Sequence, residues 1–433
     1  MNPELRRNVW LELTVHRMVA LPIALGLAFM LAYMLNEENP WPSVAVTAAS
    51  LFAALALWGG IHAGDSVTGE VRGRTWDGQR MSAMEPWAMT WGKLIGAPSF
   101  AWCGGLICLV VYLAGSPEPQ APKIAMFMVA GALLVHAVML IGSVIAARKA
   151  VVRNSSTAWA LVIALFVVGP WVSAFSTEGA QVAWWGHGRV RIDFLLASTL
   201  AFAAWGVLGA HRLLCQELRV RTAPWAWLAF LLFLCVYIAG FAIRPHDTFG
   251  QQRNVVLIAG FIVCLVALYP LLLTEASGAM AVRRLVLRYG ARDWRRLVED
   301  IPLWPVTLAT AFVFCVLIVV LVGFRAAEDG PFRNLVLAPV PLFLLALRDA
   351  AIYMFFALAR QPRRAETATL FYLMLLYWLV PMLLRAAGGD RLAGLVLPPF
   401  WEQPGYAAVI AAVQAAAVGA AALWRWRTNY GRA

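Results

Sequence analysis

Apolar runs of about twenty residues recur along this chain between short polar breaks, and no other feature limits its fold as strongly. A helix that crosses a hydrocarbon core of about 30 Å needs roughly that many apolar residues. Of the 433 residues, 62% are hydrophobic and only 13% are charged, whereas a soluble domain has roughly 25% charged residues. Alternating barrel-type strands are absent, and a lipid-exposed backbone must satisfy its own hydrogen bonds. We therefore expect an all-α polytopic membrane protein.

The apolar runs predict about twelve transmembrane helices, with six in each half of the chain. The spans expected in the first half are 18–36, 44–64, 94–114, 124–147, 157–177 and 193–211. Those expected in the second half are 224–243, 254–274, 303–324, 334–358, 367–385 and 405–424. The first run follows MNPELRRNVWLELTVHR and carries no small-residue cleavage signal, so we expect it to be retained as a helix.

Lysine and arginine are concentrated in alternate breaks, and this bias predicts the orientation of the chain. With the N-terminus inside, the inner segments hold 25 of the 35 Lys and Arg residues. Both termini should then lie on the cytoplasmic side of a bacterial inner membrane. Orientation also explains the net charge of +12, so we expect the lipid bilayer and no nucleic acid as a partner. The six cysteines show no CxxC and no paired spacing with histidine, so neither disulfides nor a metal site are expected.

The two halves resemble each other when the sequence is aligned on itself at a shift of about 210 residues. The stretch AARKAVVRNSSTAWAL from Ala146 aligns with LARQPRRAETATLFYL from Leu358, and Pro170 and Pro381 then fall at equivalent span centres. The long inner breaks also correspond, because each lies between the second and third span of its half. We expect two parallel six-helix pseudo-repeats, residues 1–215 and 216–433.

The inner break from Asp65 to Lys93 is longer than most others and contains both acidic and basic residues, which favours a docking surface over an ordinary solvated loop. Its pattern resembles the cytoplasmic loop of the type 2 ABC transporter permeases. In that loop an acidic residue precedes a Gly-Thr pair and a short helix, followed by Pro or Ser and a Gly-Lys entry into the next span. The matching residues here are Glu70, Gly73, Thr75, Trp76, Arg80, Ser82, Pro86, Gly92 and Lys93, with Arg74 inserted between Gly73 and Thr75.

The resemblance implies the permease of an ATP-driven exporter that works with separate cytoplasmic ATPase subunits, two per transmembrane unit. In that family the loop is a coupling helix in a groove of the ATPase, and an amphipathic helix precedes the first span. Here the loop would be residues 65–93, docking through Glu70, Gly73, Thr75, Trp76, Arg80 and Pro86. Residues 4–17 mix apolar and charged side chains as an interfacial helix does. The second break, 275–302, keeps the position but not the motif, and is expected to be a degenerate coupling loop.

One such chain would form a complete transmembrane unit, and a homodimer of chains is the alternative assembly. No GxxxxGK[ST] phosphate loop occurs, so this chain should bind no cofactor, and ATP and Mg should bind to the partner subunit. No HExxH, GxSxG or DDxxD-like cluster indicates an enzyme. A membrane-embedded transferase acting on lipid-linked substrates and a secondary transporter stay open as alternative functions.

A few ionisable residues fall inside predicted spans, notably His136 in the fourth and Arg348 with Asp349 in the tenth. The repeat alignment places His136 opposite Arg348. One interpretation is a polar patch on the translocation path, with Arg348 available to an anionic substrate. The other is that neighbouring helices satisfy these groups as packing residues.

Overall fold

The computed structural model describes residues 2–36, 38–82, 84–148, 181–275, 278–323, 337–359, 365–398 and 403–430. Nearly all residues in these ranges are helical. The only strands among them are β1 (Gln181–Trp184) and β2 (His187–Val190), which pair as one short hairpin. Ten of the described helices are long and apolar enough to cross a membrane. The prediction of an all-α polytopic membrane protein is confirmed.

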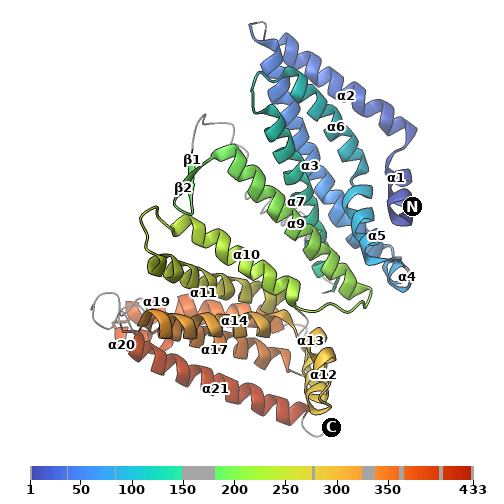
Figure 1. Cartoon of the computed structure of the whole chain (residues 1–433). Coiled ribbons are helices and arrows are strands. Elements are labelled where there is room, and N and C mark those ends of the chain that lie inside the picture. Colours follow the sequence, from blue (N-terminus) through green and yellow to red (C-terminus); the bar gives the residue numbers. More distant parts are fainter. Residues whose placement is uncertain are drawn as a thin grey trace. The chain divides into compact units, whose positions relative to one another are not determined.

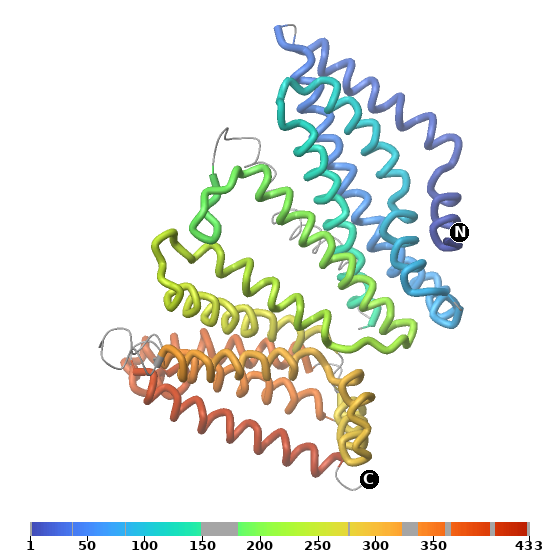
Figure 2. The backbone as a smooth tube through the Cα atoms, in the orientation of Figure 1, coloured from blue at the N-terminus to red at the C-terminus, as the bar shows by residue number. Residues whose placement is uncertain are grey.

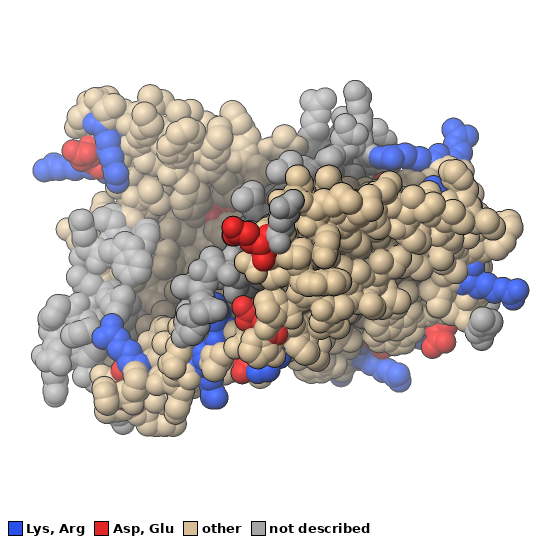
Figure 3. All heavy atoms as spheres, turned by 90° about the horizontal axis from the view of Figure 1, so that it is seen from above, with Lys and Arg blue, Asp and Glu red and all other residues tan. Residues whose placement is uncertain are grey.

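The chain divides into two compact units, which meet in sequence close to the predicted boundary between the halves. Unit 1 contains Met1–Ala183 and Gly188–Thr222, and unit 2 contains Trp184–His187 and Ala223–Ala433. Figure 1 shows the helices of each unit, and Figure 2 traces the same backbone as a tube. On the face drawn in Figure 3, Lys, Arg, Asp and Glu lie in small separate groups between large areas formed by other residues.

Unit 1 is built around the long helix α3. Its helices are α1 (Pro3–Glu12), α2 (Val15–Met34), α3 (Pro40–Arg72), α4 (Trp76–Met81), α5 (Pro86–Trp91), the π-helix η1 (Gly92–Gly96), α6 (Ser99–Gly115), α7 (Ala121–Arg148) and α9 (Arg191–Glu217). Helix α3 packs against α6 and α7, and α7 packs against α9. A Cβ atom on Gly59 would come 2.7 Å from His136 Nε2, and one on Gly60 would come 2.8 Å from Val135 Cγ1. Glycine therefore permits the close approach of α3 and α7.

Unit 2 repeats several of these helix pairings in the same chain order. Its helices are α10 (Trp225–Ala242), α11 (Phe249–Thr274), α12 (Ala279–Gly290), α13 (Trp294–Asp300), α14 (Leu303–Ile318), η2 (Val319–Gly323), α17 (Pro339–Ala357), α18 (Ala365–Met374), η4 (Leu375–Leu379), α19 (Val380–Ala386), α20 (Asp390–Val396) and α21 (Pro404–Tyr430). Helix α11 packs against α10 and α14, and α17 packs against α21. Leu268, Ala346 and Ala350 form part of the core between α11 and α17.

Two spans differ from their predicted form. Helix α3 does not end at residue 64 but continues through 65–72, which contain no proline, and ends before Gly73. The predicted span 94–114 corresponds to a broken pair of helical segments, Pro86–Gly96 and Ser99–Gly115. The second segment is bent by 55° from the direction of the first. The bend lies at Pro98, which cannot donate a backbone hydrogen bond to the preceding turn. The predicted span 157–177, with Pro170, lies outside the described residues.

Candidate functional site

Helix α1 turns its polar face inward. Asn2 caps the helix by accepting a hydrogen bond from the Leu5 N–H (3.1 Å), and its amide donates to the Ala88 carbonyl on α5 (2.7 Å). Glu4 and Asn8 lie one turn apart on the same face, and both are buried; Glu4 is only 1% exposed. The sequence predicts an interfacial helix over 4–17. In the structure α1 ends at Glu12, and its polar face packs against α5 and η1.

Two glycines of η1 make room for α1. A Cβ atom on Gly92 would lie 2.5 Å from Glu4 Cγ and 3.1 Å from the Leu5 backbone nitrogen, and one on Gly96 would lie 3.1 Å from Asn8 Cβ. The Asn8 amide also donates to the Gly92 carbonyl (3.1 Å). The glycine that precedes Lys93 in the sequence motif is therefore required by the contact between η1 and α1.

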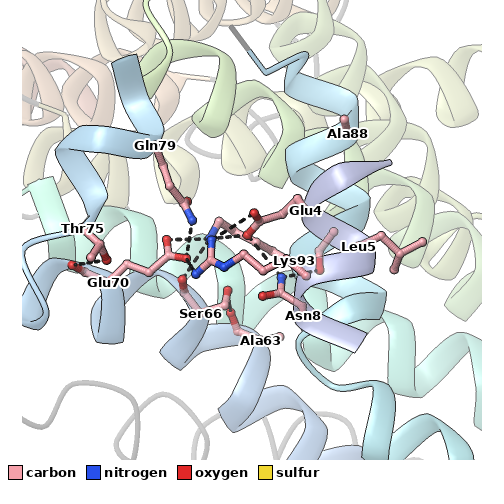
Figure 4. Close-up of polar contacts among 12 residues, drawn as sticks. Glu4, Leu5, Asn8, Ala63, Ser66, Glu70, Thr75, Gln79, Ala88 and Lys93 are labelled. Atoms are coloured by element: carbon pink, nitrogen blue, oxygen red, sulfur yellow. Dashed lines mark hydrogen bonds and ion pairs between the residues drawn. The ribbon is translucent and has the colours of Figure 1, made fainter. Parts of the chain in front are cut away.

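Lys93 follows Gly92 on η1 and is fully buried, with 0% of its side chain exposed. Its Nζ lies 2.8 Å from Glu70 Oε2 and 3.5 Å from Glu4 Oε1, and it donates to the Ser66 carbonyl at 2.9 Å (Figure 4). The ammonium also lies 5.3 Å from the centre of the Trp76 ring. A buried charge is tolerated when it is paired and hydrogen-bonded, and Lys93 meets both conditions.

Glu70, near the end of α3, connects this lysine to the rest of the segment. Its Oε1 accepts hydrogen bonds from Gln79 Nε2 on α4 (2.5 Å) and from Arg7 on α1 (3.2 Å). Its backbone carbonyl accepts from the Thr75 N–H (2.9 Å) and from the Thr75 hydroxyl (3.3 Å). Glu70 thus ties together α3, the turn after it, α4, α1 and η1. We call Glu4, Glu70 and Lys93 the Lys93 network.

The turn between α3 and α4 contains Arg74, the residue that interrupts the expected Gly-Thr pair. Arg74 has a φ of 56°, in the left-handed region, whereas Gly73 has a φ of −75°. The position that most favours glycine is therefore Arg74 and not Gly73. Thr75 follows directly and makes the hydrogen bonds to Glu70.

Helix α4 is attached to unit 1 by a second set of contacts. Trp76 is buried in an apolar cluster with Val67 and Leu214, among others. Arg80 Nε lies 3.4 Å from Glu217 Oε2 at the end of α9, and Glu217 Oε1 accepts from Arg148 Nε of α7 at 2.6 Å. One carboxylate therefore links α4, α7 and α9.

The six residues predicted to dock an ATPase divide into two groups. Glu70 and Trp76 point inward, and Arg80 is half-buried against Glu217, so these three fix the position of α4. Gly73 and Thr75 are exposed, and Pro86 occupies the first position of α5. The outer surface of α4 also exposes Asp77, Gly78 and Met81, and Met81 is 86% exposed. Sequence reasoning did not identify Glu4, Asn8 or Glu217, because their partners lie far away in the chain.

A second buried ionic cluster lies in unit 2. Asp349 is 0% exposed, and its Oδ1 accepts hydrogen bonds from Arg348 Nε (3.0 Å) and Nη2 (2.9 Å). Its Oδ2 accepts from the hydroxyls of Tyr269 (2.8 Å) and Tyr377 (2.7 Å). Arg348 Nη1 donates to Gln414 Oε1 at 2.6 Å. The two charges are therefore balanced within the cluster, which joins α11, α17, η4 and α21.

This arrangement bears on the role predicted for Arg348. Its guanidinium is buried and engaged by Asp349 and Gln414, and it lies 5.0 Å from the centre of the Tyr377 ring. Side chains of α17 and α21 therefore bind the Arg348 guanidinium, which the sequence analysis considered as a binding group for an anionic substrate. Tyr269, Tyr377 and Gln414 gave no signal in the sequence, because a polar aromatic or amide residue in an apolar run is unremarkable by itself.

His136 on α7 is buried in unit 1. Its Nε2 lies 3.1 Å from the Ala56 carbonyl, and its ring meets the Trp102 ring edge-on at 5.0 Å. Its Nδ1 has no hydrogen-bond partner in the described part of the chain. Both rings line a small cavity together with Phe52 and Gly105. His136 is therefore packed between α3, α6 and α7.

Within the described ranges, no group of three or more His, Cys, Asp or Glu side chains is arranged to hold a metal ion. No family model, curated protein or solved structure matches the chain. A function for this chain therefore has to be inferred from its own residues and their contacts.

Proposed function

We propose that this chain is the transmembrane permease of a type 2 ABC exporter in a bacterial inner membrane. It would have twelve spans in two parallel six-helix repeats, with both termini cytoplasmic. The observation that carries the proposal is the connection between α3 and α6. There, the motif residues build a short helix, α4, whose inner side is anchored in the protein and whose outer side is exposed.

The anchoring suits α4 to transmit force. Glu70 and Gln79 join it to α3, and Arg80 joins it to α9 through Glu217. A push on the exposed side at Met81 would therefore move the ends of several spans together. Alternating access in transporters is largely a rigid-body rocking of such helix groups.

The chemistry of the Lys93 network favours a stiff link over a loose one. Removing one partner of a buried ion pair costs about 3–5 kcal/mol, because the other charge is left without compensation. Sliding α1 or α3 away from η1 would separate Lys93 from Glu4 or from Glu70 and would carry a similar penalty. The segment is expected to move as one body with the cytoplasmic ends of α3 and η1.

In this proposal each repeat supplies one wall of a central route, and two cytoplasmic ATPase subunits bind ATP and Mg, one of which docks on α4. The repeat alignment places His136 opposite Arg348, and His136 and the Arg348–Asp349 pair would position the wall helices next to that route. One chain would be a complete transmembrane unit. The substrate is left open.

The proposal is tested by affinity purification of the tagged chain in mild detergent, with mass spectrometry and an ATPase assay on the proteins that accompany it. A Walker-type ATPase should co-purify, and Met81→Asp should abolish its recovery while leaving the level of the membrane protein unchanged. Val220→Asp is the matched control, because it also places a charge at an exposed apolar position of unit 1. A chain that reproducibly purifies alone would refute the permease and favour an embedded enzyme or a secondary transporter.

A further inference from the structure

Helices α12 and α13 form a hairpin, residues 279–300, that has no buried residue. It leaves the end of α11 and returns at the start of α14. Glu275 Oε2 accepts hydrogen bonds from the backbone N–H groups of Leu303 (2.7 Å) and Trp304 (3.1 Å), so both ends of the hairpin lie at one point. In Figures 1 and 2 the hairpin runs across the ends of the long helices of unit 2, near the C-terminus. It is therefore held where α11 ends and α14 begins.

The hairpin exposes large apolar side chains on its surface. Met280 is 69% exposed and Tyr289 is 64% exposed, and Val286, Leu287 and Trp294 are exposed to similar degrees. Exposed apolar residues so close together indicate a surface that is covered by something else. On α12, Met280 and Leu287 lie on one face with Arg283 and Arg284 between them, at helical spacing. Apolar and cationic groups thus share a single face.

The hairpin also carries a clear excess of positive charge. It contains six arginines against three acidic residues, which leaves a net charge of +3. The ion pairs within it use Arg288 with Asp300, Arg295 with Glu299 and Arg296 with Asp293. The excess is therefore carried by Arg283, Arg284 and Arg292.

The two helices are fixed to each other, so the surface is preformed. Arg288 Nη1 donates to the Arg296 carbonyl at 2.7 Å, and the Tyr289 and Trp294 rings meet edge-on at 5.6 Å. A preformed surface costs less entropy when it binds than a segment that must first fold.

We propose that the α12–α13 hairpin binds the anionic headgroup surface of the lipid bilayer. Its apolar side chains enter the boundary between headgroups and acyl chains, and its unpaired excess of arginine binds lipid phosphates through charge-assisted hydrogen bonds. Position, exposed apolar surface and net charge all fit this one partner. The second inner break would then anchor unit 2 to the membrane surface instead of docking an ATPase. This inference does not depend on the transport proposal.

The test is amide hydrogen exchange of the full-length chain, purified without other proteins, in nanodiscs of phosphatidylglycerol or of phosphatidylcholine. Amides of residues 279–298 should exchange more slowly in the anionic lipid. In R283Q/R284Q/R292Q that difference should fall by roughly tenfold or more, since each arginine near an anionic surface contributes appreciably to binding. The control R6Q/R74Q/R219Q removes the same charge from exposed positions of unit 1 and should leave the difference intact.

Equal exchange of the hairpin in the two lipids would overturn the proposal. Protection that arises only after a soluble protein is added would also overturn it, because the partner would then be a protein. If R283Q/R284Q/R292Q keeps the same lipid-dependent protection as the control variant, the three arginines do not carry the interaction. That result would also contradict the proposal.

Discussion

The two units connect their second and third long helices in very different ways. In unit 1, residues 65–93 are anchored in the protein by a fully buried lysine, which pairs with two carboxylates from α1 and α3. In unit 2, residues 275–302 turn outward, and no residue of α12 or α13 is buried. The two segments have similar lengths and the same place in the chain. A place between the second and third long helices therefore does not fix what a connection does; its pairing of charges does.

The largest effect should come from removing the centre of the Lys93 network. Lys93→Met leaves Glu4 and Glu70 without their shared ammonium, and should destabilise unit 1 by about 3–5 kcal/mol. Thermal unfolding in detergent measures this loss. The triple variant E4Q/E70Q/K93M removes all three charges and should regain most of the lost stability. If K93M alone melts like the wild type, the network does not hold the segment.

A comparable but smaller loss is expected in unit 2, where tyrosines share the contact. Asp349→Asn leaves the buried Arg348 guanidinium without a carboxylate, and should cost about 3 kcal/mol. Tyr377→Phe removes a single hydrogen bond to that carboxylate and should cost about 1–2 kcal/mol. Both values come from the same unfolding measurement. Equal losses for D349N and Y377F would contradict an ionic core in this cluster.

Relief of backbone strain should have a smaller effect in the opposite direction. Arg74→Gly places glycine at a φ of 56° and should stabilise the turn by about 0.5–1 kcal/mol, since a left-handed conformation costs most residues about 1–2 kcal/mol. Arg74→Ala removes the charge but keeps the strain, and serves as the control. Stabilisation by both variants would assign the effect to charge.

The smallest effect should come from breaking the ion pair within the hairpin. Asp300→Ala removes the partner of Arg288, and because both side chains are partly exposed, the loss should be at most about 1 kcal/mol. The free energy of unfolding of this variant, measured in the same way, should differ from that of the wild type by no more than about 1 kcal/mol. A loss as large as that of K93M would erase the contrast between the two connections.

Sequence patterns correctly predicted an all-α polytopic membrane protein, because a run of apolar residues long enough to cross a bilayer has few alternative structures. The ends of the helices were harder. The charged residues in 65–72 are compatible with a polar loop and equally with a polar continuation of α3, so the sequence could not distinguish the two.

Long-range polar partnerships could not be predicted. Glu4 looked like a surface charge of an amphipathic helix, and only its contact with η1, almost ninety residues later, makes it internal. Tyr269 and Tyr377 join Asp349 from separate helices. In both clusters a π-helix supplies one partner, η1 with Lys93 and η4 with Tyr377. Such helices are frequent at functional sites and depend on tertiary contacts that local sequence does not reveal.

Photo-crosslinking in cells, from a benzophenone residue placed at Met81 or at Met280, tests most directly whether α4 is the docking helix. We expect position 81, on the exposed side of α4, to capture a Walker-type ATPase, and position 280, on α12, to capture none. An ATPase captured from position 280 but not from position 81, or from neither, would contradict the claim that α4 is the docking helix.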